Sequence, residues 1–141
     1  MPTFNIGSDC QVVVNGPFGE IELDNETQFS ADPVSQILSV DKLDGTVEGR
    51  TVHRNWKGTI STIRSDSTVD DLAQKISDSI RTGVPVPNGS IQQVVHNVGD
   101  GTSSTYLFTD VSFNVTALGD YQNSKEVRQG IAWQAKSRSV A

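Results

Sequence analysis

Four carboxylates alternate with other residues along the stretch "GEIELDNETQF", residues 19–29. They are Glu20, Glu22, Asp24 and Glu26. Because side chains alternate between the two faces of a β-strand, a strand here would carry all four acids on one face. The pair Asp24–Asn25 also favours a turn, which would send Glu26 to a different face. Glu20 and Glu22 are therefore the firmer members of this acidic stripe.

The acidic stripe has few basic neighbours in sequence, since the first fifty residues hold nine acids against Lys42 and Arg50. A calcium ion would suit carboxylate ligands, which usually converge from a curled loop. A straight strand instead spaces alternate carboxylates about 6–7 Å apart, too far for several to share one ion. This spacing disfavours a shared metal ion, so a solvated strand face is favoured over a calcium site.

Other residues that could do chemistry are few. His53 and His96 fall in predicted strands without metal-ligand spacing, and Cys10, the only cysteine, precedes a valine run as a small buried residue would. No G-x-S-x-G, Walker or G-x-G-x-x-G pattern occurs. We therefore expect no enzyme, no cofactor and no metal site.

The composition fits one soluble domain spanning residues 1–141. No apolar run could span a bilayer, and the first residues do not resemble a secretory signal, so we expect synthesis in a cytosol and no membrane partner. A net charge of −6 argues against binding the phosphates of nucleic acid. The charge is uneven, because residues 1–50 are acidic and residues 121–141 are basic, which suits head-to-tail self-association.

Alternation and turn signals predict a mainly β chain. Strands are expected at residues 9–15, 34–43 and 51–63, with a hairpin turn or loop at Asp44–Gly45 and a bulge at Gly58. Further strands are expected at 91–98, after the turn "GDGTSS", and at 127–138. The inward parity switches near Thr109–Asp110, which predicts a second bulge. Trp56 and Trp133 share parity with aliphatic residues and are expected in the core, which disfavours a sugar-binding platform.

One amphipathic helix is predicted at about 67–82. Ser67 can cap it, with Asp70 as the partner in a capping box, and Gly83 can end it. Its apolar stripe packs on the sheet and consists of Val69, Leu72, Ala73, Ile76 and Ile80. The fold class is therefore a small antiparallel β-barrel or sandwich with one flanking helix.

The run at residues 43–76 resembles the tail tube proteins of contractile-tailed bacteriophages. An L-D-G-x-V strand precedes a W-x-G-x-I strand, and R-x-D-x-x-x-D-D then opens the helix. The matching residues are Leu43, Asp44, Gly45, Val47, Trp56, Gly58, Ile60, Arg64, Asp66, Asp70 and Asp71. A Tyr106-bearing strand, "VSFNV", a Gly-Asp turn and a basic closing strand extend the likeness.

The resemblance implies a structural virion protein with an N-terminal arm and inter-subunit loops. Six copies would form a hexameric ring, and rings would stack helically into a tail tube that contacts sheath, baseplate and tail terminator proteins. The tube would be made in the host bacterial cytoplasm. DNA would be ejected through its acidic lumen without specific binding, because a lining that repels phosphates lets DNA slide. Glu20, Glu22, Asp24 and Glu26 are the candidate lumen residues.

Two alternatives stay open beside this reading. Tubes of pyocin and secretion systems share the fold that the resemblance implies. A small ligand- or calcium-binding β-domain would also fit a chain of this size.

Overall fold

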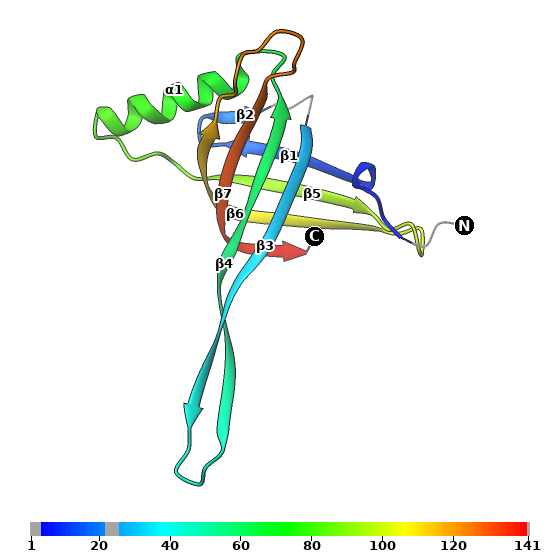
Figure 1. Cartoon of the computed structure of the whole chain (residues 1–141), viewed down its shortest axis with the longest axis vertical. Coiled ribbons are helices and arrows are strands. Elements are labelled where there is room, and N and C mark those ends of the chain that lie inside the picture. The colour runs from blue at the N-terminus through cyan, green and yellow to red at the C-terminus, as the bar shows by residue number, and fades with distance from the viewer. Residues whose placement is uncertain (1–3, 22–25, 141) are drawn as a thin grey trace.

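The computed structural model describes residues 4–21 and 26–140, which form one antiparallel sheet and one flanking helix (Figure 1). The strands are β1 (Cys10–Gly16), β2 (Gly19–Ile21), β3 (Glu26–Asp41), β4 (Val47–Ile63), β5 (Gly89–His96), β6 (Ser103–Ala117) and β7 (Arg128–Val140). The helix α1 (Thr68–Arg81) follows β4, and a short 3₁₀ turn, η1 (Gly7–Asp9), precedes β1. The predicted mainly β fold with one helix is confirmed.

The strand order is β2-β1-β5-β6-β7-β4-β3, so β2 and β3 end the sheet. The sheet bends across itself: β1 and β5 cross the direction of β3 and β4, and β6 and β7 curve from one layer to the other (Figure 1). Over the described residues the sheet is not closed by hydrogen bonds between β2 and β3. The architecture is thus a small sandwich made from one coiled sheet.

The core lies between the two layers. The largest fully buried side chains come from β4, β5, β6 and β7: Phe108, Ile60, Ile91, Ile131 and Val111. Trp133 stacks on Phe29, with ring centroids 5.7 Å apart, and meets Phe108 edge-on at 4.9 Å. The core position predicted for Trp133 is confirmed, and Trp56 packs partly buried against the same cluster.

The bulge predicted in β6 is confirmed. Asp110 has a φ of 51°, and the pairing of β5 with β6 shifts register between Gly89 and Ile91, opposite this point. An additional residue in one strand turns the following side chains to the other face. This is why Phe108 and Val111, on opposite parities, both point into the core.

The bulge predicted at Gly58 in β4 is wrong. The register with β3 shifts between Val34 and Ser35, whose partners are Asn55 and His53, so the additional residue is Arg54. Gly58 is required for a different reason, because a Cβ there would overlap the Ser30 carbonyl oxygen of β3. The glycine permits close approach of the two backbones.

The helix begins and ends close to its predicted bounds, and Val69 and Leu72 are buried against the sheet. The predicted capping box is wrong. The Ser67 hydroxyl donates to Asp71 Oδ2 at 3.1 Å and makes no cap bond to the backbone. Asp70 is engaged elsewhere, because Arg64 and Gln129 both donate to its carboxylate.

Candidate assembly surface

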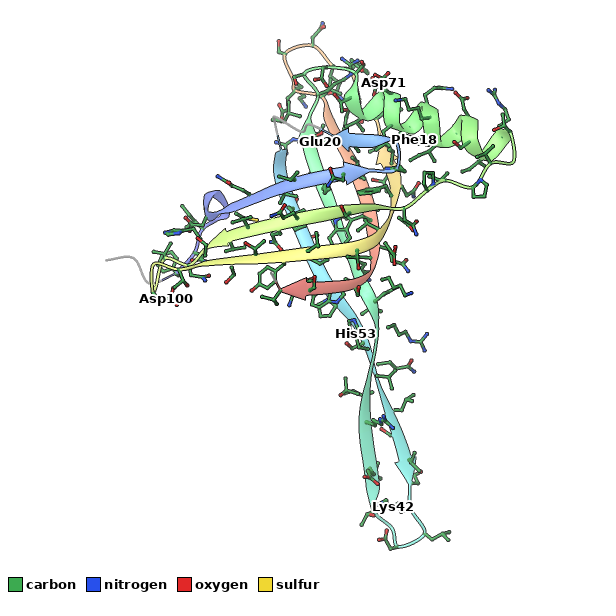
Figure 2. The ribbon with its side chains drawn as sticks, turned by 180° about the vertical axis from the view of Figure 1, so that it is seen from behind. Phe18, Glu20, Lys42, His53, Asp71 and Asp100 are labelled. Atoms are coloured by element: carbon green, nitrogen blue, oxygen red, sulfur yellow. The ribbon has the colours of Figure 1, made fainter. Side chains whose placement is uncertain are left out.

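Two of the four acids predicted to share one strand face, Glu20 and Glu26, lie on different strands. Glu20 is exposed on β2 opposite Asn15, and Glu26 is the first residue of β3 (Figure 2). β2 pairs with β1 and β3 pairs with β4, at opposite edges of the sheet, so one strand does not carry both Glu20 and Glu26. Glu22 and Asp24 lie outside the described residues, as does the side chain of Glu26.

The most prominent surface is a hairpin that leaves the sheet. β3 pairs with β4 from Glu26 to Asp41, whereas β7 covers β4 only between Trp56 and Ile63. Residues 35–53 therefore extend away from the sandwich as a twisted two-stranded ribbon (Figure 1). We call this segment the free ribbon.

The tip of the free ribbon is an ordered turn. Asp44 Oδ1 accepts a hydrogen bond from the Thr46 backbone N–H at 3.0 Å and one from the Thr46 hydroxyl at 2.6 Å. These bonds lower the pKa of the Asp44 carboxyl, the hydroxyl bond most. Lys42 Nζ and Glu48 Oε2 lie 2.7 Å apart across the turn. The Asp44–Gly45 turn predicted from the sequence is confirmed.

Apolar side chains are exposed on both faces of the free ribbon. Leu38, Val40 and Val52 share one face, and Ile37 and Val47 share the other. Val40 is 62% exposed and Ile37 is 70% exposed. A two-stranded ribbon is marginally stable alone in water, and exposed apolar residues gathered on one element mark contact surfaces. The free ribbon has the character of a segment that binds other protein.

A cation–aromatic cluster holds the base of the free ribbon. The Arg138 guanidinium lies 4.1 Å from the centre of the Trp56 ring and 4.3 Å from that of Tyr106. The His53 ring lies beside the Trp56 ring, with 5.6 Å between the two ring centroids. Arg138 pairs with Phe108 across β6 and β7, so its side chain lies on the same face of the sheet as that core residue.

At the opposite end of the molecule, Asp70 of α1 accepts hydrogen bonds from Arg64 and Gln129. Its Oδ2 accepts hydrogen bonds from Arg64 Nε at 3.1 Å and Nη2 at 3.0 Å, and its Oδ1 accepts one from Gln129 Nε2 at 2.8 Å. Gln129 is only 3% exposed and also donates to the Leu118 carbonyl. The Asp70 hydrogen bond is the main cause that raises the pKa of Arg64.

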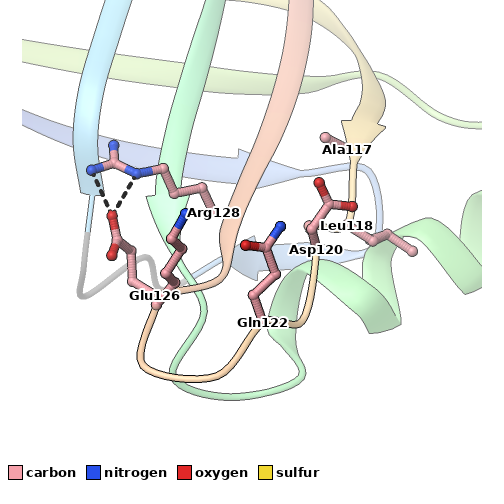
Figure 3. Close-up of a pocket in the computed structure, with 8 residues that line it drawn as sticks. Ala117, Leu118, Asp120, Gln122, Glu126 and Arg128 are labelled. Atoms are coloured by element: carbon pink, nitrogen blue, oxygen red, sulfur yellow. Dashed lines mark hydrogen bonds and ion pairs between the residues drawn. The ribbon is translucent and has the colours of Figure 1, made fainter.

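The loop between β6 and β7 encloses an open hollow of about 550 Å³ at this end (Figure 3). Asp120 and Lys125 line it, and Arg128 pairs with Glu126 at 3.0 Å. The hydrogen bond from the Glu126 backbone N–H is the main cause that lowers the pKa of the Glu126 carboxyl. The hydrogen bond from Arg128 lowers this pKa further. Charges of both signs and wide access to water suit a contact loop better than an enclosed catalytic site.

Within residues 4–21 and 26–140, no group of three His, Cys, Asp or Glu side chains could hold a metal ion. His53 and His96 lie on separate strands, β4 and β5. Cys10 is half-buried, with Gln93 Nε2 3.4 Å from its sulfur. No helix among the described residues has both the length and the apolar character to cross a membrane.

The described fold is shared with solved proteins of contractile injection systems. The chain matches one from the tube-terminating cap of the anti-feeding prophage with a TM-score of 0.63 at 11% identity, covering 100% of this chain and 93% of that one. A chain from the extended sheath–tube complex of the extracellular contractile injection system PVC matches with a TM-score of 0.59 at 12% identity, covering 93% and 88%.

A third match comes from the virion of a gene transfer agent, with a TM-score of 0.55 at 12% identity over 98% of this chain and 99% of that one. No family model and no curated protein matches the sequence. The fold is that of tail tube, cap and terminator proteins of contractile, phage-like systems. The resemblance found in the sequence is confirmed at the level of fold.

Proposed function

We propose that this chain is a structural, non-enzymatic subunit of a contractile tail tube. The observation that carries the proposal is the match of nearly the whole chain to nearly whole cap and tube-complex proteins. An exposed apolar ribbon on a chain of this size supports it, because such a surface suits an assembled state. The tube is made of hexameric rings of this chain that stack helically.

Each ring closes through contacts between one surface of a copy and a different surface of the next copy. β3 ends the sheet, so its outer edge presents backbone groups that another copy can pair. The acidic first third of the sequence and its basic end favour head-to-tail contacts between neighbours. Head-to-tail contacts form rings when the rotation closes and filaments when it does not, and a tube uses both.

The lumen of the tube carries the acidic residues. Glu20 is exposed on β2 and is the strongest candidate, with Glu22 beside it in sequence and Asp24 and Glu26 following. A negative lining repels phosphates, so DNA passes during ejection into the host cell without being bound.

The tube belongs to the virion tail of a bacteriophage, and the chain is made in the host bacterial cytoplasm. It contacts sheath, baseplate and tail terminator proteins but no membrane. Support comes from the assemblies that contain its structural matches: a sheath–tube complex, a sheath/tube terminator and a baseplate. A tube of a pyocin or secretion-type system is the related alternative, since the matches include injection systems.

Negative-stain electron microscopy of the purified chain tests the proposal. We expect rings and stacked tubes, with six copies per ring by light scattering of isolated rings. A species that stays monomeric at high concentration contradicts the tube proposal. Rings with another number of copies contradict only the six-fold symmetry.

A further inference from the structure

A groove opens between the C-terminal half of α1 and the end of β6. Val69 and Leu72 are buried against the sheet, whereas Ile80, two turns further on, is 68% exposed. The helix leaves the sheet along its length, as Figure 1 shows, and the space beside it measures about 410 Å³. Ala73, Ile76, Ile80 and Val115 line this α1–β6 groove together with Ser77, Arg81 and Asn114. The groove thus joins an aliphatic surface to polar groups, and the described chain does not cover it.

The free ribbon and the α1–β6 groove lie at opposite ends of the molecule (Figures 1 and 2). The tip of the ribbon, near Lys42, points away from the sandwich, and α1 borders the far end. The two surfaces cannot meet within one copy. They meet when a second copy is displaced along the long axis, which is the relation that a head-to-tail stack repeats.

The two surfaces also match in chemistry. Leu38 and Val40 offer exposed aliphatic side chains on one face of the ribbon, and the groove offers aliphatic walls. The tip, residues 41–50, holds three acids against two bases, with Lys42 paired to Glu48, whereas residues 75–81 of α1 hold Lys75 and Arg81 against Asp78, which pairs with Arg81. The tip is thus net negative and the groove end net positive.

We propose that the α1–β6 groove receives the free ribbon of the next copy in the stack. The inference rests on the proposed tube function and names the acceptor for one of its contacts. Leu38 and Val40 enter the groove beside Ile76 and Ile80, and the acids of the tip face Lys75 and Arg81. The apolar residues on the other ribbon face, Ile37 among them, stay available for a further copy.

Disulfide trapping tests the contact directly, because Cys10 is the only native cysteine. In a Cys10→Ser background, Val40→Cys combined with Ile80→Cys should give a ladder of covalent multimers when assembled tubes meet an added oxidant. Val40→Cys combined with Val13→Cys is the matched control, since Val13 is also an exposed valine, on β1. Tubes that form normally but trap both pairs equally overturn the groove assignment and leave the tube proposal intact. A chain that forms no tubes overturns both.

A charge in the groove gives a second test. Ile80→Glu would bury an unpaired carboxylate in the contact, so we expect rings to persist while stacking weakens by at least about tenfold. Gln74→Glu adds the same charge at an exposed position of α1 and should stack as the native chain does. Normal stacking of Ile80→Glu, or equal loss in both variants, overturns the proposal.

Discussion

Asp70 joins three parts of the chain through one carboxylate. It lies in the first turn of α1 and accepts hydrogen bonds from Arg64, just after β4, and from Gln129 on β7. Gln129 is buried, so its amide depends on protein acceptors instead of water. Asp70 therefore acts as a structural anchor of the helix and not as a helix cap.

Replacing Asp70 by alanine should destabilise the fold. The buried Gln129 amide loses one of its two acceptors, which costs about 1–3 kcal/mol. Chemical denaturation should show a lower midpoint with an unchanged slope. Asp71→Ala is the matched control, because Asp71 lies in the same helical turn and its carboxylate accepts a hydrogen bond from the exposed Ser67 hydroxyl. Its effect should stay within about 0.5 kcal/mol. Equal losses in the two variants would show that helix-dipole charge, not the anchor, matters.

Three turns share the pattern Asp-x-Thr, at Asp44, Asp66 and Asp100, and each threonine donates to the aspartate two residues before it. At Asp100 the Thr102 hydroxyl donates at 2.7 Å and the backbone N–H at 3.0 Å. The hydroxyl bond is the largest cause that lowers the pKa of Asp100 below 3.8. The spacing is visible in the sequence and marks these turns.

Thr102→Val removes the hydroxyl donor and keeps the side-chain volume, so the pKa of Asp100 should rise toward 3.8, measured by NMR titration. The folded-state pKa lies below the unfolded one. The turn therefore stabilises the fold above about pH 4 and loses this contribution as pH falls through the folded-state pKa. Thr46→Val should move Asp44 and leave Asp100 unchanged. An Asp100 pKa that does not respond to Thr102→Val would contradict this account.

Features that neighbouring residues determine could be predicted from the sequence, whereas features that depend on distant partners could not. The Asp44–Gly45 turn is set by its own residues and was predicted. The capping box failed because Arg64 and Gln129 compete for Asp70. The sequence does contain one indication of this network. Gln129 is a polar residue at an inward position of the last strand, and such a residue needs a buried hydrogen-bond partner.

Among the elements, the pairing of β3 with β4 depends on a glycine. A Cβ at Gly58 would overlap the Ser30 carbonyl and come within 2.7 Å of Trp133 Cζ2. Gly58→Ala should therefore cost about 1–3 kcal/mol, measured by denaturation, because backbone and core must both shift. Gly49→Ala is the control in the same strand, since a Cβ there meets Ile37 Cγ2 at 3.5 Å, an ordinary contact. A Gly58→Ala variant as stable as Gly49→Ala would refute the close approach.

The elements that follow regular patterns were predicted well. The final strand alternates cleanly, and α1 has both a periodic stripe and end signals. The free ribbon could not be predicted. The part of the β3–β4 hairpin that β7 covers and the part that it leaves uncovered have similar sequence patterns. Which part of a hairpin is covered depends on the reach of a strand distant in the sequence.

The charge of the whole assembly gives the test of the acidic lumen. Glu20 is exposed on β2, and Glu20→Lys would replace a repelling charge by an attracting one in every copy around the ring. Tubes assembled with DNA present should then retain it at low salt and release it as salt rises, because counterion release drives such binding. Native tubes should retain little.

Nuclease protection separates a lumen position from an outer one. The tail tube resemblance implies that the helix lies on the outer flank of the tube. Asp71→Lys makes the same charge change at an exposed position of α1, so any DNA it attracts there should remain open to digestion. DNA held by Glu20→Lys tubes should be protected, since the tube wall encloses it. If Glu20→Lys tubes assemble yet protect no more DNA than Asp71→Lys tubes, Glu20 lies outside the lumen. Because β2 and β3 are separate strands, Glu26→Lys must be tested independently and does not follow from the result at Glu20.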